Sequence, residues 1–265
     1  MATLWSDTIQ SAASINSCGF NVFANSTEHP IDTTVAPSDS NGANLSLVTD
    51  PLTGSGQVIR HYGLFDAGGA RAQTHMSSSS NTPYHDAIMG TGVYVAEKLY
   101  FPSALSGSGW LNIRDFHSIT DVGGDRWDTA PGLLLRSDGS MQFQYDNHGT
   151  SQTSGWSSIG LPVGEWFWLE TFYKFSSVGF TMSSRINGTE VLSFDGMITE
   201  NGTTHTVGET YLKWYGETQG APAWSPAGAT KFVRAVNLND AWMTFVSSNT
   251  GVAVRHMHRT QHGQS

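Results

Sequence analysis

The sequence predicts an all-β protein, a two-sheet antiparallel jelly-roll sandwich. Apolar residues recur with a period of two along most of the chain, which is typical of strands with one buried face. Turn-forming residues separate these runs at short intervals. The chain has 29 Gly, 13 Phe, 9 Trp and 8 Tyr but only 13% charged residues, a composition that favours twisted sheets over helices.

The alternating runs give the expected strands in chain order. After an N-terminal strand and a loop around Glu28 to Gly42, strands are expected at Leu45–Val48, Gln57–Leu64, Arg71–Met76, Asp86–Phe101, Trp110–Ile119, Leu133–Arg136, Met141–Tyr145, Trp166–Phe175, Phe180–Arg185, Glu190–Phe194, Thr210–Tyr215 and within Phe232–Phe245. Asp138-Gly139 and Asn187-Gly188 predict tight hairpin turns. Trp166, Trp168 and Phe172 alternate on one strand, and we interpret them as core or intersheet packing.

The 265 residues fit one domain spanning residues 1–265, because no linker, repeat or low-complexity segment interrupts the pattern. Residues 1–60 are expected to be N-terminal strands or an arm, and residues 250–265 form a basic, His-rich tail. The single cysteine, Cys18, excludes an intrachain disulfide.

The formal net charge of -9 argues against nucleic-acid and membrane partners. The first residues, Met1 to Asp7, resemble no signal peptide, and no apolar run is long enough to span a bilayer. Three explanations are open: the protein stays in the cell that makes it, a signal segment has been removed, or the protein leaves the cell by lysis as part of a virus particle. We expect a location in the virion, or outside the cell after lysis.

Three separated segments carry the residues expected to form a binding groove. Residues i and i+2 share one face of a strand. The groups expected to share a face are Arg71, Gln73 and His75; Asp115 and His117; and Tyr211, Lys213 and Tyr215. Charged, imidazole and phenol groups on one face suit a solvated surface that holds a polar polymer.

The order of motifs from Thr82 to about Phe245 resembles the concanavalin A-like lectin/glucanase jelly roll, in its polysaccharide-lyase-like branch of heparin-lyase and alginate-lyase relatives. The segments that carry this resemblance are residues 83–87, 99–103, 110–117, 161–170, 186–191 and 239–241. The resemblance implies two curved antiparallel sheets with a glycan groove on the concave face.

The resemblance also implies a site for β-elimination. It implies catalytic roles for Arg71, His117, Tyr211 and Tyr215, and substrate-binding roles for Gln73, His75, Asp115 and Lys213. A histidine suits the base because its pKa lies near neutral pH, and a tyrosine can protonate the leaving oxygen. The position that neutralises the uronate carboxylate in these lyases holds Asp115 here, and a carboxylate there repels the uronate.

Because of this departure, the first hypothesis is a carbohydrate-binding jelly roll without turnover, on the surface of a phage tail or capsid. An active polysaccharide lyase and a purely structural virion protein are the alternatives. The expected partner is a polysaccharide or cell-surface glycan, with virion proteins or further copies of the chain as other partners.

Alternative roles stay open for several residues. His117 could be a base, a glycan donor or a structural partner of Asp115, and Arg71 could clamp a sugar or pair with Asp115. No cofactor is expected. A loop cluster could bind Ca²⁺ or be a plain solvated loop; it consists of Asp121, Asp125 and Asp128. A tail cluster could bind a metal or dock on a sheet edge or a partner; it consists of His256, His258 and His262.

Overall fold

The computed structural model describes residues 3–6, 9–13, 43–63, 70–77, 91–105, 110–118, 131–147, 150–175, 179–197, 207–216 and 229–245. Within these ranges the chain forms fourteen strands and one short 3-10 helix, η1. The elements are β1 Thr3–Ser6, η1 Ile9–Ser11, β2 Ala43–Thr49, β3 Gln57–Gly63, β4 Ala70–Ser77, β5 Val93–Tyr100, β6 Leu111–Ser118, β7 Pro131–Leu135, β8 Met141–Asn147, β9 Thr150–Thr153, β10 Trp166–Phe175, β11 Gly179–Ile186, β12 Thr189–Met197, β13 Val207–Gly216 and β14 Ala229–Asn239.

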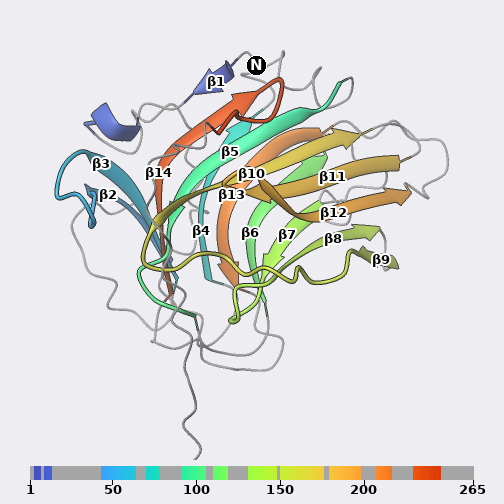
Figure 1. The fold of residues 1–265 in the computed structure, drawn as a ribbon, viewed down its shortest axis with the longest axis horizontal. Helices are drawn as coiled ribbons and strands as arrows, with labels where there is room; N and C mark the ends of the chain where they lie inside the picture. The colour runs from blue at the N-terminus through green and yellow to red at the C-terminus, as the bar shows by residue number, and fades with distance from the viewer. Residues whose placement is uncertain are drawn as a thin grey trace, which may run out of the picture.

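The strands form two antiparallel sheets that lie one over the other (Figure 1). Sheet A has eight strands in the order β12-β11-β10-β5-β14-β3-β2, with β1 paired to β14. Sheet B has six strands in the order β4-β13-β6-β7-β8-β9. The predicted all-β sandwich is therefore confirmed. The early strands β1, β2 and β3 all pair within sheet A, so the described part of residues 1–60 belongs to the sandwich.

The core lies between the two sheets. Sheet A contributes alternate residues such as Leu99 and Phe167, and sheet B contributes Leu133 and Phe143; all four are 0% exposed. We call the face that each sheet turns away from the other its outer face. Among the described residues, no helix is long and apolar enough to cross a membrane.

Both predicted hairpin turns are confirmed. Asn187 and Gly188 join β11 to β12 with φ of 48° and 84°, the left-handed pair that a two-residue hairpin turn requires. Gly139 lies between β7 and β8 with φ of 82°. Glycine meets this demand without the steric penalty of a Cβ atom.

The prediction that Trp166, Trp168 and Phe172 pack in the core is wrong. The interior positions of β10 are those of Phe167, Leu169 and Tyr173, which are all 0% exposed. The three predicted residues lie half-buried on the outer face of sheet A. Strand periodicity gives two faces, and both faces of β10 are aromatic, so residue type does not reveal the interior one.

The prediction of closing strands within Phe232–Phe245 is also only partly right, because one strand, β14, covers the start of this range and ends at Asn239. Residues 240–245 instead cross the outer face of sheet A. The Trp242 ring lies 4.8 Å from Tyr94, and the Met243 N–H donates to Glu170 Oε1 at 2.7 Å. This segment explains why Glu170 is buried although it lies on an outer face.

Candidate functional site

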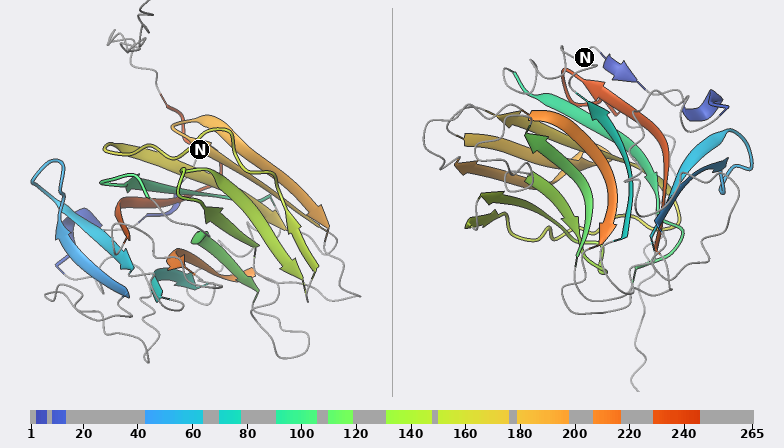
Figure 2. Two further views of the ribbon diagram at one scale, coloured as in Figure 1. Left: turned by 90° about the horizontal axis from the view of Figure 1, so that it is seen from below. Right: turned by 180° about the vertical axis from the view of Figure 1, so that it is seen from behind.

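The three segments predicted to form one groove are the adjacent strands β4, β13 and β6 of sheet B. Strand β13 lies between the other two, and the three strands bend together (Figure 2). Tyr211 pairs with His75 on one side and with Asp115 on the other. Directly opposed residues of antiparallel strands lie on the same face of a sheet. These three positions therefore form one cross-strand row.

The other five predicted positions occupy neighbouring rows. Lys213 pairs with Gln73, and Tyr215 pairs with Arg71. His117 pairs with Glu209, which is two residues along β13 from Tyr211, so His117 lies in the next row on the same face. The register thus brings all eight backbone positions together. The side chains of these eight residues lie outside the described part of the structure, so their individual roles stay predictions.

A β-bulge in β6 determines which face these rows occupy. Asn112 pairs with Leu134 and Arg114 with Leu133, so β6 has one more residue than β7 at this point. Ile113 and Arg114 both lie on the interior face: Ile113 belongs to the core, and Arg114 reaches Glu97 of sheet A. The alternation resumes after Arg114, which puts the Asp115 and His117 positions on the outer face.

The Tyr211 row continues across the whole of sheet B. Asp115 pairs with Gly132, Gly132 with Gln144, and Gln144 with Thr153. Gly132 has no side chain, and a Cβ atom at this position would lie 3.0 Å from Asn112 Nδ2. The space over Gly132, in the middle of the row, is therefore filled by the amide group of Asn112, and Gly132 is buried.

The neighbouring outer-face side chains on β6 and β8 are neutral and polar. Asn112 is 9% exposed, and its Oδ1 accepts a hydrogen bond from the Arg114 N–H at 3.1 Å. Gln142 is half-buried, and its Nε2 donates to the Ser154 carbonyl at 2.6 Å. Amides of this kind can donate to and accept from sugar hydroxyls.

A buried ion cluster lies beneath these rows, between the sheets. The Arg114 guanidinium pairs with Glu97 through Nε at 3.1 Å and through Nη2, and its Nη1 donates to the Val95 carbonyl at 3.3 Å. Lys231 Nζ lies 3.9 Å from the other oxygen of Glu97. The exposed fraction is 0% for Arg114 and Lys231 and 1% for Glu97.

Burial lowers the pKa of Lys231 to about 8, against the opposing effect of Glu97 and with the help of Arg114. Sequence reasoning missed this cluster. One signal for it exists, because Glu97 occupies an interior position in the alternating run that includes Val93, Val95 and Leu99.

The register bears on one alternative considered for Arg71. Arg71 pairs with Tyr215, whereas Asp115 pairs with Tyr211. Four residues along a strand correspond to roughly 13 Å. The register therefore does not favour a direct ion pair between Arg71 and Asp115. The regular pairing of β13 with β4 also puts the Tyr215 position on the same face of the sheet as the Tyr211 position.

The candidate metal ligands lie outside the described residues. These are Asp121, Asp125 and Asp128 in the loop and His256, His258 and His262 in the tail. Within the described ranges, no group of three His, Cys, Asp or Glu residues could hold a metal ion.

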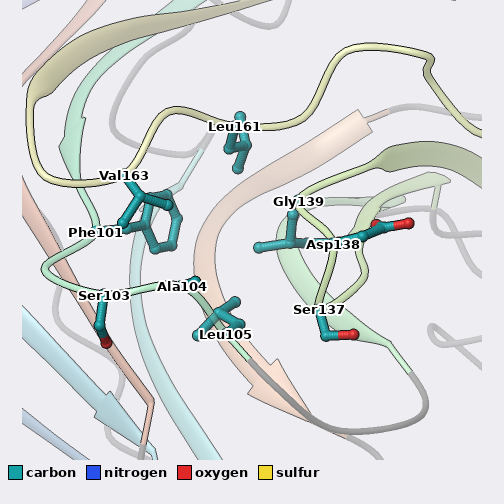
Figure 3. A pocket seen from close by; sticks show the side chains of 10 residues that line it. Phe101, Ser103, Ala104, Leu105, Ser137, Asp138, Gly139, Leu161 and Val163 are labelled. Carbon is teal, nitrogen blue, oxygen red and sulfur yellow. The ribbon is translucent and has the colours of Figure 1, made fainter. Parts of the chain in front are cut away.

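A separate pocket lies at one end of the sandwich and has a volume of about 70 Å³. Phe101, Leu105, Leu161 and Val163 give it an apolar lining (Figure 3). Asp138 lies at its edge, and its carboxylate points away from the cavity and accepts hydrogen bonds from Ser140 N and Oγ at 2.9 and 2.6 Å. The carboxylate is therefore already engaged, and the pocket offers no acid–base pair.

No protein-family model matches the sequence, and no curated protein matches it. Among solved structures, the chain is similar to the binding domain of botulinum neurotoxin serotype C1, with 9% identity over 76% of this chain and a TM-score of 0.46. It spans 45% of that domain's length.

The chain is also similar to two alginate lyases. For the one from Klebsiella pneumoniae the identity is 10%, the coverage 73% of this chain and 83% of the lyase, and the TM-score 0.47. For the one from Pseudomonas aeruginosa these values are 18%, 69%, 82% and 0.45. Alginate lyases are the class that the sequence resemblance implied. At these identities the likeness concerns the fold, so activity is argued from this chain's own residues.

Proposed function

We propose that the protein binds a carbohydrate chain on the outer face of sheet B, over strands β4, β13 and β6. The observation that carries this proposal is the row in which His75, Tyr211 and Asp115 are directly opposed. Imidazole, phenol and carboxylate groups can donate to or accept from sugar hydroxyls, and a phenol ring can pack against a sugar ring.

Charge divides the proposed site into two parts. Asp115 repels a uronate carboxylate by about 1–4 kcal/mol at contact distance, depending on solvent exposure. The Asp115 row therefore suits a neutral part of the glycan. Lys213 and Arg71 belong to the two rows that follow Tyr211 along β13, on the side away from His117, and they can bind an acidic group of the glycan.

A binding experiment tests the proposal. The protein is titrated with alginate, glucuronan and heparin-like polymers, and a glycan array extends the search. Tyr211→Ala should weaken binding at least about tenfold, a loss of roughly 1.4 kcal/mol. Thr181→Ala, an exposed position on the opposite sheet, is the matched control and should bind as the parent does. Equal binding, or equal silence, of parent and Tyr211→Ala would contradict the proposal.

The register also favours a second candidate function, a polysaccharide lyase. The His117 and Tyr211 positions are two residues apart along β13, because His117 pairs with Glu209. Two residues correspond to about 7 Å, which one sugar ring and its glycosidic oxygen can span. His117 would remove the proton beside the uronate carboxylate, and Tyr211 would protonate the leaving oxygen as the C–O bond breaks and the C=C bond forms. The register does not favour Tyr215 as this acid, because its position is six residues along β13 from Glu209, roughly 20 Å.

The lyase reaction is followed by the ultraviolet absorbance of its unsaturated product. His117→Ala should reduce the rate at least about 100-fold, the usual contribution of a general base. If no uronate polymer gives a product, the binding function is left. A role on the virion surface stays a prediction, and light scattering tests it, because a plain monomer would weaken it.

A further inference from the structure

The β-bulge at Ile113 and Arg114 decides which residues of β6 face outward. Strict alternation from the core residue Leu111 would put positions 113, 115 and 117 on the interior face and Arg114 outside. The strand instead turns both Ile113 and Arg114 inward. Only because of this extra residue do the Asp115 and His117 positions join the Tyr211 row and its neighbour on the outer face.

Arg114 holds this bulge through contacts with the opposite sheet. Its guanidinium bonds to Glu97 through two nitrogens and to the Val95 carbonyl through a third. Its own N–H donates to Asn112 Oδ1, which closes the bulge locally. The guanidinium therefore ties β6 of sheet B to β5 of sheet A at one point along both strands.

This arrangement is a costly way to fill a core. Taking a guanidinium and a carboxylate out of water carries a large desolvation penalty, and an apolar pair of similar volume is often as stable or more stable. Such pairs are retained in some proteins because they fix one register against alternatives. In β6 the alternative register is specific, since a one-residue slip moves every later side chain to the other face.

We propose that Arg114 is a positioning residue: through Glu97 it holds the bulge of β6 and so keeps Asp115 and His117 on the face of the glycan site. Its relevance to function rests on the proposed glycan binding. The register claim itself can be tested without any glycan.

Thiol labelling reads the register directly. In a Cys18→Ser background, a single cysteine replaces either Phe116 or His117, and the rate of reaction with a maleimide is measured under native conditions. Arg114→Met is then added to each. Loss of the bulge should slow labelling at position 117 and speed it at position 116, each at least tenfold. General destabilisation would speed labelling at both positions, so opposite changes identify a change of face.

Control variants keep the outcome decisive. A cysteine in place of Gln142, on the same face but in β8, should label at the same rate with and without Arg114→Met. Arg114→Lys should give an intermediate effect, because lysine keeps the charge but lacks the planar fork that binds two partners. If Arg114→Met does not fold, Glu97→Gln takes its place, since it weakens the same pair at almost unchanged volume.

Two results would overturn the inference: unchanged labelling at positions 116 and 117, or changes in the same direction at both. The glycan arm is scored separately, and Arg114→Met should lose binding in parallel with the change in labelling. If the labelling inverts but the parent protein binds no glycan, the register inference stands and the proposed function fails.

Discussion

Strands β10 and β6 differ in how strictly their side chains alternate between the interior and the outer face of the sheet. Strand β10 pairs with β5 and β11 over its length without a register shift. Its interior residues, among them Phe167 and Leu169, and its outer residues, among them Trp168, keep one parity from end to end. Strand β6 has a register shift against both of its neighbours, β7 and β13.

The comparison shows that polarity alone does not tell which face of a strand is buried. On β10 both faces are aromatic, and the outer one is partly covered by residues 240–245. On β6 a charged residue, Arg114, is buried. At this residue the alternation of side chains between the interior and the outer face shifts by one position. The buried charge of β6 therefore has a structural consequence that the apolar interior of β10 does not have.

The largest expected effect comes from removing the carboxylate that pairs with Arg114. Glu97→Leu leaves the guanidinium buried without its anion, and the free energy of unfolding should fall by about 3–5 kcal/mol. Urea denaturation followed by tryptophan fluorescence measures the change.

The double variant Glu97→Leu/Arg114→Met separates the pair from the packing. It should be less destabilised than Glu97→Leu alone, because no guanidinium is then left without its partner. Costs that simply add would show that the two side chains act independently.

A second prediction tests the two faces of β10. Phe167→Ala removes a side chain that is 0% exposed and should cost about 3–5 kcal/mol. Trp168→Ala removes a larger ring on the outer face. Among the described contacts of this ring, Lys98 Nζ lies over it at 5.6 Å from the ring centroid. The substitution should lower the free energy of unfolding by about 1–2 kcal/mol, because the ring is only half-buried. Chemical denaturation of both variants gives the difference, and equal costs would contradict the assignment of faces.

Much of the fold follows from sequence patterns. Alternation and the Asn187-Gly188 turn predict the bounds of β10 and, to within one residue at each end, those of β11, because these interactions are local. Strand β12 runs three residues beyond the predicted end at Phe194. The pairing of β4 with β13 and of β13 with β6 joins segments far apart in the chain. Their polar faces and the family resemblance predicted that they share one groove, but no sequence pattern predicted their register. The covering of Glu170 by residues 240–245 had no sequence signal, since a short segment without alternation leaves no period to read.

The candidate site shows the same division. Its residue types and their i, i+2 spacing on each strand were predictable. The parity change in β6 had a signal that was not used: apolar residues stand at positions 111 and 113 and then at 116, so the apolar period breaks between Ile113 and Phe116. The interior position of Glu97 in the alternating run of β5 indicates a buried carboxylate, but it does not identify Arg114 as its partner, because intersheet contacts are not encoded in the period of either strand.

The smallest predicted effect concerns another buried carboxyl group, that of Glu170 on β10. Burial raises its pKa, while the Met243 N–H and Arg185 act against the rise. The folded protein therefore keeps this proton to higher pH than the unfolded chain does. Stability contributed by the protonated form is present below the unfolded pKa of about 4.5 and is lost as the pH rises through the folded value.

Glu170→Gln cannot ionise and should remove this dependence. The free energy of unfolding of the parent, relative to the variant, should fall as the pH is raised from 4 towards neutrality, by less than the two effects above. Urea denaturation at a series of pH values measures the difference, and Glu165→Gln controls for the loss of one exposed acid, immediately before the same strand. Unlike Glu97, Glu170 has no guanidinium hydrogen-bonded to it among the described contacts, so its removal should leave the register of β10 intact. Parallel profiles for parent and Glu170→Gln would show that burial by residues 240–245 does not govern this carboxyl.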